Sequence, residues 1–228
     1  MSKQKYNPQH DGFQTVEEAL TKTERYIEEN RKSLSIIIIV ILIVVGGFFS
    51  YKKFYLEPKE NEAQSEMFMA EKYFELDSFN LTLEGDGQYK GLLDIIDDYA
   101  ATKSANLACY YAGISYLRLG QYEDAIDYLK DFDGNDRLVS IVALGAIGDA
   151  YVELDEYEKG VSYYEKAANL NENELLSPVY LMKSGIVYES INENKKALDV
   201  YEQIKANYPN STEAEEIDKY ITAVKLKM

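Results

Sequence analysis

The chain has almost no cysteine or histidine, two residues on which many catalytic and metal sites depend. It contains one cysteine, Cys109, and one histidine, His10, among 228 residues. A single cysteine allows no internal disulfide, and Cys109 falls on the apolar face of a helical pattern, where a small buried side chain is expected. The chain contains no Cys–His pair, no G-x-S-x-G turn and no phosphate-binding loop. We therefore predict no catalytic residue, no metal ligand and no cofactor, and a protein that is not an enzyme.

Basic residues are also scarce. The chain has 24 Lys and Arg against 40 Asp and Glu, and residues 54–228 alone hold 34 acidic and 16 basic residues. This balance argues against binding of nucleic acid or of anionic lipid headgroups. A basic or amphipathic partner remains compatible with it. Residues 131–136 superficially resemble a calcium loop, but glycine is missing at the sixth position and glutamate at the twelfth, so a turn between repeats is expected.

No charge interrupts the stretch from Ser33 to Tyr51, which is almost entirely Ile, Val, Leu and Phe. About 18 helical residues at ~1.5 Å each cover roughly 27 Å, close to the hydrocarbon thickness of a bilayer. The 33 residues before Leu34, and the lack of a small-residue cleavage site after the apolar stretch, distinguish it from a signal peptide. We predict one transmembrane helix over 34–53, which places the chain in a lipid bilayer.

The sequence around the span predicts how the chain is organised near the membrane. A capping box that starts at Thr15 predicts a juxtamembrane amphipathic helix over 15–33, after a disordered tail over 1–14. Near the span, the basic residues on its N-terminal side outnumber those on its C-terminal side by one, four to three, which favours a cytoplasmic N-terminus and an external domain. Gly46 and Gly47 mark either a close contact between membrane helices or glycines tolerated near a helix end.

Four positions recur in three stretches that begin at Cys109, Leu144 and Leu181, with periods of 35 and 37 residues. Each stretch has a glycine, a tyrosine three residues later, a small residue after twelve and a large one after sixteen. In chain order these are Gly113, Tyr116, Ala125 and Leu129, then Gly148, Tyr151, Gly160 and Tyr164, then Gly185, Tyr188, Ala197 and Tyr201. The pattern resembles the tetratricopeptide repeat, a helix–turn–helix of 34 residues in which the glycine lets the second helix approach the first. This resemblance implies an all-α fold, an α-solenoid that follows the transmembrane helix.

The rest of the chain is expected to complete the solenoid. Residues 54–104 predict a degenerate first repeat, with Ala70, Tyr73 and Phe79 in its first helix and an insertion over 80–88. Its second helix is expected from Tyr89, with Gly91 and Ile95 at the small and large positions. Residues 105–228 predict three repeats and a C-terminal capping helix over 211–226, with Asn210 or Ser211 as its N-cap.

Tetratricopeptide solenoids usually present side chains of their first helices on a concave face. That pattern predicts ten partner-binding residues: Tyr110, Ile114, Leu117, Arg118, Asp149, Val152, Glu153, Met182, Ile186 and Glu189. Their mixture of apolar and charged side chains suits an apolar peptide. The alternative is that the first group, which also includes Leu107, packs against the degenerate repeat.

The junction YIEENRKSL, residues 26–34, resembles that of the YfgM-like family, ancillary subunits of the SecYEG translocon, in which an aromatic residue and an E-N-x-K-x-L run enter a single span. The resemblance implies a bacterial inner-membrane protein with a cytoplasmic tail and periplasmic repeats. It also implies association with SecYEG and a PpiD-like chaperone, and assistance to newly translocated secretory clients. We expect five membrane-docking residues: Tyr26, Asn30, Lys32, Gly46 and Gly47. The alternative is a membrane-tethered adaptor of another envelope assembly, or one whose repeats face the cytoplasm.

Overall fold

The computed structural model describes residue 24, residues 26–134 and residues 136–228. The chain divides into two units, Met1–Glu57 and Pro58–Met228. The predictions for the tail, the capping box and His10 fall outside the described residues. Within the described ranges every regular element is a helix, and the one β pairing is an isolated bridge between Gly85 and Lys90. The prediction of an all-helical fold is confirmed.

The first unit contains α2 (Arg31–Tyr51), followed by the π-helical segment η1 (Lys52–Leu56). No residue of α2 is buried. An 18-residue stretch here has a mean hydropathy of 2.8, so the helix is long and apolar enough to cross a membrane. Asn30 precedes α2 and donates a side-chain hydrogen bond of 2.9 Å to the carbonyl oxygen of Tyr26.

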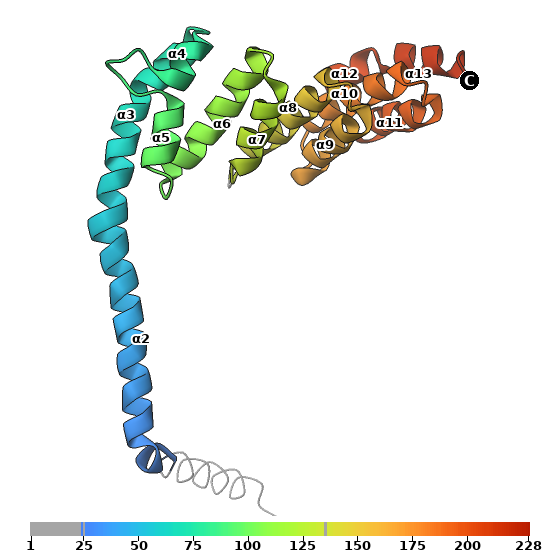
Figure 1. Ribbon diagram of the computed structural model, residues 1–228. Helices are drawn as coiled ribbons and strands as arrows, with labels where there is room; N and C mark the ends of the chain where they lie inside the picture. Colours follow the sequence, from blue (N-terminus) through green and yellow to red (C-terminus); the bar gives the residue numbers. More distant parts are fainter. Residues whose placement is uncertain (1–23, 25, 135) are drawn as a thin grey trace, which may run out of the picture. The chain divides into compact units, whose positions relative to one another are not determined.

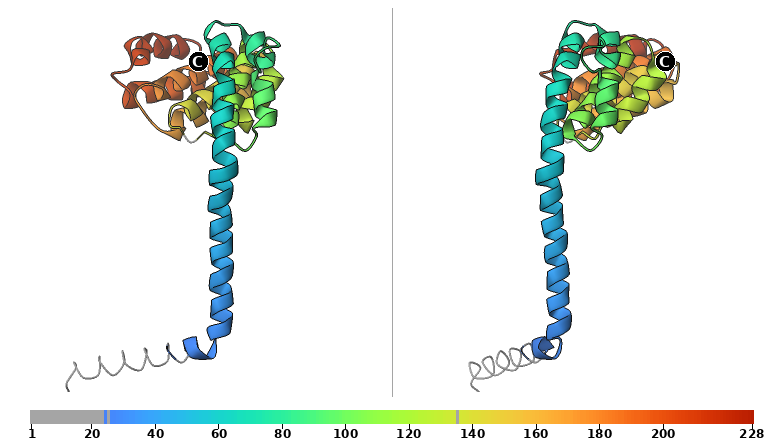
Figure 2. Two further views of the ribbon diagram at one scale, coloured as in Figure 1. Left: turned by 90° about the vertical axis from the view of Figure 1, so that its left-hand side faces the viewer. Right: turned by 60° about the vertical axis from the view of Figure 1, so that its left-hand side comes forward.

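The second unit is a row of helices in chain order (Figure 1). The left view of Figure 2 shows the red, orange, yellow and green helices next to one another along this row. The helices are α3 (Glu57–Glu75), α4 (Phe79–Glu84), α5 (Leu92–Asp98), α6 (Lys103–Arg118), α7 (Tyr122–Asp131), α8 (Val139–Glu153), α9 (Tyr157–Leu170), α10 (Ser177–Ser190), α11 (Asn194–Asn207), α12 (Thr212–Glu215) and α13 (Ile217–Lys225). Three clusters of buried apolar residues follow one another along this row, one centred on α3 to α6, one on α7 and α8, and one on α9 to α13.

The two helices of each repeat approach closely at the predicted glycine. A Cβ atom on Gly148 would lie 2.6 Å from Cδ1 of Tyr164 and 3.1 Å from the carbonyl oxygen of Gly160. The corresponding contacts in the other two repeats would be 2.5 Å from Gly113 to Cγ of Leu129 and 2.3 Å from Gly185 to Cε1 of Tyr201. Each glycine therefore leaves room for the large residue sixteen positions later, as the spacing predicts.

The same helix-ending turn occurs four times. One residue of each turn has a positive φ: Asp77 (54°), Gly120 (76°), Asp155 (58°) and Asn192 (61°). The next backbone N–H donates a hydrogen bond of 2.9 Å to a tyrosine carbonyl five residues earlier, on Tyr73, Tyr116, Tyr151 and Tyr188 respectively. This is the Schellman arrangement, in which a left-handed residue lets the final carbonyls of a helix find donors. The turn at Asp77 places the degenerate repeat in register with the other three.

That register corrects the predicted first repeat. Phe79 does not belong to the first helix, because α3 ends at Glu75 and Phe79 begins α4 after the turn. Thr82, fully buried, follows Asp77 by five residues, as the small residue Ala125 follows Gly120. The small position is thus filled by Thr82 and not by Gly91, which instead precedes α5 as its N-cap.

The insertion predicted over 80–88 is wrong in its first part, because residues 79–84 form α4. The extra residues are those of the loop 85–91, which divides the second helix of this repeat into α4 and α5. The loop between them closes with the bridge from Gly85 to Lys90. Asp86 accepts backbone hydrogen bonds from Gln88 (2.9 Å) and Tyr89 (2.8 Å). These bonds hold the pKa of the Asp86 carboxyl below its usual value, with a further contribution from the Tyr73 hydroxyl. Ile95 of α5 is fully buried, as predicted.

The capping helix also differs from the prediction of one helix over 211–226. Ser211 is the N-cap, and its Oγ accepts a hydrogen bond of 3.2 Å from the N–H of Ala214. The helix breaks at Glu216 between α12 and α13. An unbroken helix would bring Glu213 and Glu216 together as like charges three residues apart, which opposes it.

Candidate functional site

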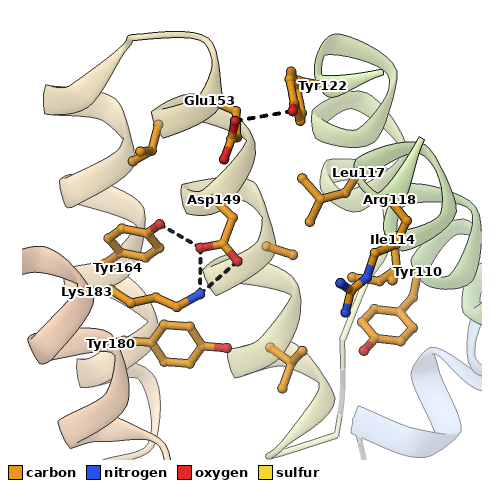
Figure 3. Close-up of a pocket in the computed structure, with 13 residues that line it drawn as sticks. Tyr110, Ile114, Leu117, Arg118, Tyr122, Asp149, Glu153, Tyr164, Tyr180 and Lys183 are labelled. Carbon is orange, nitrogen blue, oxygen red and sulfur yellow. Dashed lines mark hydrogen bonds and ion pairs between the residues drawn. The ribbon is translucent and has the colours of Figure 1, made fainter. Parts of the chain in front are cut away.

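Helices α6, α8 and α10 form the walls of a cleft of about 640 Å³ within the repeats (Figure 3). Seven of the ten predicted partner-binding residues line it: Tyr110, Ile114, Leu117, Arg118, Asp149, Val152 and Glu153. The structure adds six residues that the sequence did not predict: Tyr122, Val142, Ala146, Tyr164, Tyr180 and Lys183. Val142, Ala146 and Asp149 are spaced by four and three residues, which places them on one face of α8. This spacing could have predicted Val142 and Ala146 from the sequence.

The other three predicted residues lie outside this cleft. Met182 packs against the third core cluster, and Ile186 is exposed. Glu189 accepts hydrogen bonds of 2.8 Å from the Tyr201 hydroxyl and 2.8 Å from Nζ of Lys227. Glu189 therefore connects α10 with α11 and the C-terminal end of the chain.

The predicted alternative for the first group applies to one residue. Leu107 packs against the cluster formed by α3 to α6, and so covers the degenerate repeat. In contrast, Tyr110, Ile114 and Leu117 pack against the next cluster, which α7 and α8 dominate. These three side chains thus belong to the wall of the cleft.

Asp149 is fully engaged inside the cleft. Its Oδ1 accepts a hydrogen bond of 2.6 Å from the Tyr164 hydroxyl. Nζ of Lys183 lies 2.7 Å from Oδ1 and 2.9 Å from Oδ2. Burial raises the pKa of Tyr164 above its usual value, and the hydrogen bond to Asp149 raises it further. This network joins α8, α9 and α10, so it fixes the spacing of two neighbouring repeats.

Tyr180 reaches the cleft because α8 has a second glycine. A Cβ atom on Gly145 would lie 1.9 Å from Cε1 of Tyr180, so only glycine leaves space for the ring. Burial raises the pKa of Tyr180 to about 12, and the charge of Asp149 contributes. The ring of Tyr180 stacks with that of Tyr164 at a centroid distance of 6.3 Å. The G-x-x-G spacing of Gly145 and Gly148 is the sequence signal for this extra contact.

The predicted docking residues belong to the first unit, and none of them is among the residues that line the cleft. Tyr26 and Lys32 are exposed, and a Cβ atom on Gly46 or Gly47 would meet nothing within 4 Å. These positions leave room for a neighbouring helix. Their predicted role in membrane docking stays a prediction.

The single cysteine, Cys109, is buried. Burial raises the pKa of the Cys109 thiol to about 11, so the thiol stays protonated and unreactive at neutral pH. Within the part of the chain that the structure describes, no three His, Cys, Asp or Glu side chains form a group that could hold a metal ion.

Comparison with known protein families identifies the repeated unit. One model of the tetratricopeptide repeat matches residues 141–174, and a second matches residues 108–133 and 180–211. Residues 108–211 carry three tetratricopeptide repeats. The three stretches expected from Cys109, Leu144 and Leu181 fall within these matches, so their assignment is confirmed. A search of curated proteins finds no match to the chain.

The repeat identifies a general role. Tetratricopeptide repeats are generally non-catalytic scaffolds that mediate binding to protein partners. The matches identify no particular translocon family.

Proposed function

We propose that this protein is a non-catalytic, membrane-anchored adaptor whose repeat cleft binds a segment of a protein partner. The cleft between α6, α8 and α10 carries this proposal, because it combines an apolar surface with exposed charged groups. Ile114, Leu117 and Val152 provide the apolar part, while Arg118 and Glu153 remain exposed. A pocket with apolar walls and a few polar groups is the usual form of a binding site.

The anchor is α2. At ~1.5 Å per residue its 21 residues cover roughly 31 Å, about the thickness of a bilayer core. Its Ile, Val and Phe side chains are exposed in the chain by itself, which suits contact with lipid. Phe54 and Tyr55 in η1 are exposed as well, and aromatic residues favour the membrane interface.

The more specific proposal is an accessory subunit of the SecYEG translocon in the bacterial inner membrane. The resemblance of residues 26–34 to the YfgM-like junction supports it, with a cytoplasmic N-terminus and periplasmic repeats. The cleft would then bind a PpiD-like chaperone or a newly translocated client. Anchoring raises the local concentration of the repeats near emerging chains.

Photo-crosslinking in intact cells tests the role of the cleft. A benzophenone amino acid replaces Tyr122, which lines the cleft, and in a matched control replaces the exposed Tyr89 of the α4–α5 loop. We expect a specific protein adduct from the first position and none from the second. The same adducts from both positions, or none from Tyr122, would contradict binding in the cleft.

Two experiments test the anchor and its docking. Protease added to spheroplasts should degrade the repeats if they are periplasmic; protection until the cells are broken would favour cytoplasm-facing repeats. Exchange of residues 15–53 for an unrelated span should abolish co-purification with SecYEG. If the intact protein never co-purifies with SecYEG, an adaptor of another envelope assembly becomes the better proposal.

A further inference from the structure

We propose that the cleft selects a protein segment in which apolar side chains are flanked by an acidic side chain, which pairs with Arg118, and a basic side chain, which pairs with Glu153. This inference rests on the proposed function and specifies the chemistry of the partner. Four charged residues line the cleft: one internal ion pair, and two groups that have no ion partner among the described residues and are called free below.

The internal pair is Asp149 and Lys183. Both carboxylate oxygens of Asp149 contact Nζ of Lys183, and Oδ1 also accepts from the Tyr164 hydroxyl. A partner charge would have to displace these short contacts to reach either residue. The pair therefore presents a neutral, fixed surface and contributes little to the choice of partner.

Arg118 is the free positive group. Its side chain is exposed, and within the described residues no hydrogen bond, ion pair or ring contact involves its guanidinium. Figure 3 shows the guanidinium directed into the space between α6 and α8. A planar guanidinium offers parallel N–H donors that match a carboxylate, so an acidic side chain is its best complement.

Glu153 is the free negative group, on the opposite wall. It is exposed, and Oε2 accepts a long hydrogen bond of 3.3 Å from the Tyr122 hydroxyl. No ion pair involves its carboxylate within the described residues. A lysine or arginine of the partner would provide the missing positive charge.

Apolar side chains line the same cleft as the two free groups. Ile114 and Leu117 come from the wall that carries Arg118, and Val152 comes from the wall that carries Glu153. Because residues 54–228 carry a large negative charge, a purely acidic segment would be repelled before it reached Arg118. A segment with both signs of charge satisfies the cleft and avoids this repulsion.

Binding of defined peptides to the full-length protein in detergent micelles tests the inference. Four blocked, fluorescently labelled peptides share a leucine-rich centre and differ at two flanking positions, which are Glu and Lys, Gln and Lys, Glu and Gln, or Gln and Gln. Fluorescence anisotropy gives each affinity. We expect the Glu–Lys peptide to bind most tightly, and its advantage to fall as salt is added.

Two cleft variants assign the charges. Arg118→Gln should weaken binding roughly 3- to 10-fold for the peptides that carry Glu and leave the others unchanged. Glu153→Gln should do the same for the peptides that carry Lys. Arg137→Gln and Glu158→Gln are matched controls, because both side chains are exposed and neither lines the cleft. They should leave all four affinities unchanged.

The outcomes separate this inference from the proposed function. Equal affinities for the four peptides, or equal losses in the cleft and control variants, would overturn the pairing of charges but leave a cleft that binds apolar segments. If no peptide binds while the crosslinker at Tyr122 still captures a partner, the inference fails and the proposed function stands. If neither occurs, both fail.

Discussion

One methyl group added at Gly148 should destabilise the repeats, although alanine is the better helix former. The new Cβ would lie 2.6 Å from two carbons of the Tyr164 ring. That ring cannot move freely, because its hydroxyl donates a hydrogen bond of 2.6 Å to Asp149 and its face stacks with Tyr180. Either the ring loses these contacts or α8 and α9 separate.

The expected loss follows from two opposing effects. Overpacking of a core typically costs about 1–3 kcal/mol. The change from glycine to alanine inside a helix returns roughly 0.5–1 kcal/mol. We expect a net loss of roughly 1–2 kcal/mol, which for a domain of this size lowers the melting temperature by roughly 2–8 °C.

Thermal melting of the full-length protein in detergent micelles, followed by helical circular dichroism, measures this loss. Ser162→Ala is the matched control, because Ser162 is exposed on the neighbouring α9. It should change the melting temperature little. In a Tyr164→Ala background the ring is absent, so Gly148→Ala should lower the melting temperature much less than it does in the wild-type background. An equal cost in both backgrounds would refute the close contact as the cause.

Three further predictions use the same assay. Asn192→Gly should raise the stability by about 0.5–1 kcal/mol, since Asn192 has a φ of 61°, and a lower melting temperature would contradict the shared turn. Asp149→Asn should cost roughly 1–2 kcal/mol through the lost contacts with Lys183, whose side chain is 40% exposed; an unchanged melt would show that the network is not structural. Burial raises the pKa of Tyr180 from 10.0 to about 12. The stability that the protein gains from keeping this hydroxyl protonated is therefore fully present below pH 10 and is lost as the pH rises towards 12. Tyr180→Phe should therefore reduce the fall in melting temperature over that range, and an unchanged fall would contradict this assignment.

The recurring spacing predicted the paired helices of the three repeats well, because the same local requirements act in every copy. A glycine such as Gly148 and a small residue such as Gly160 are needed wherever two helices approach closely, so the pattern is visible without a structure. The degenerate repeat lacked this visible pair. Thr82 fills the small position there. Threonine is also common in loops, so this residue does not mark the position as part of a helix.

The sequence by itself determined the apolar span, the repeat and the helix faces, since each follows from periodicity along one element. Only the tertiary structure decided which charges in the cleft are free. Asp149 and Lys183 lie 34 residues apart and meet because α8 packs beside α10. Arg118 and Glu153 were predicted on the same basis as Asp149, yet they keep their charges unpaired. Whether two charges pair depends on the distance between side chains on different helices, and the spacing of residues along one helix does not give that distance.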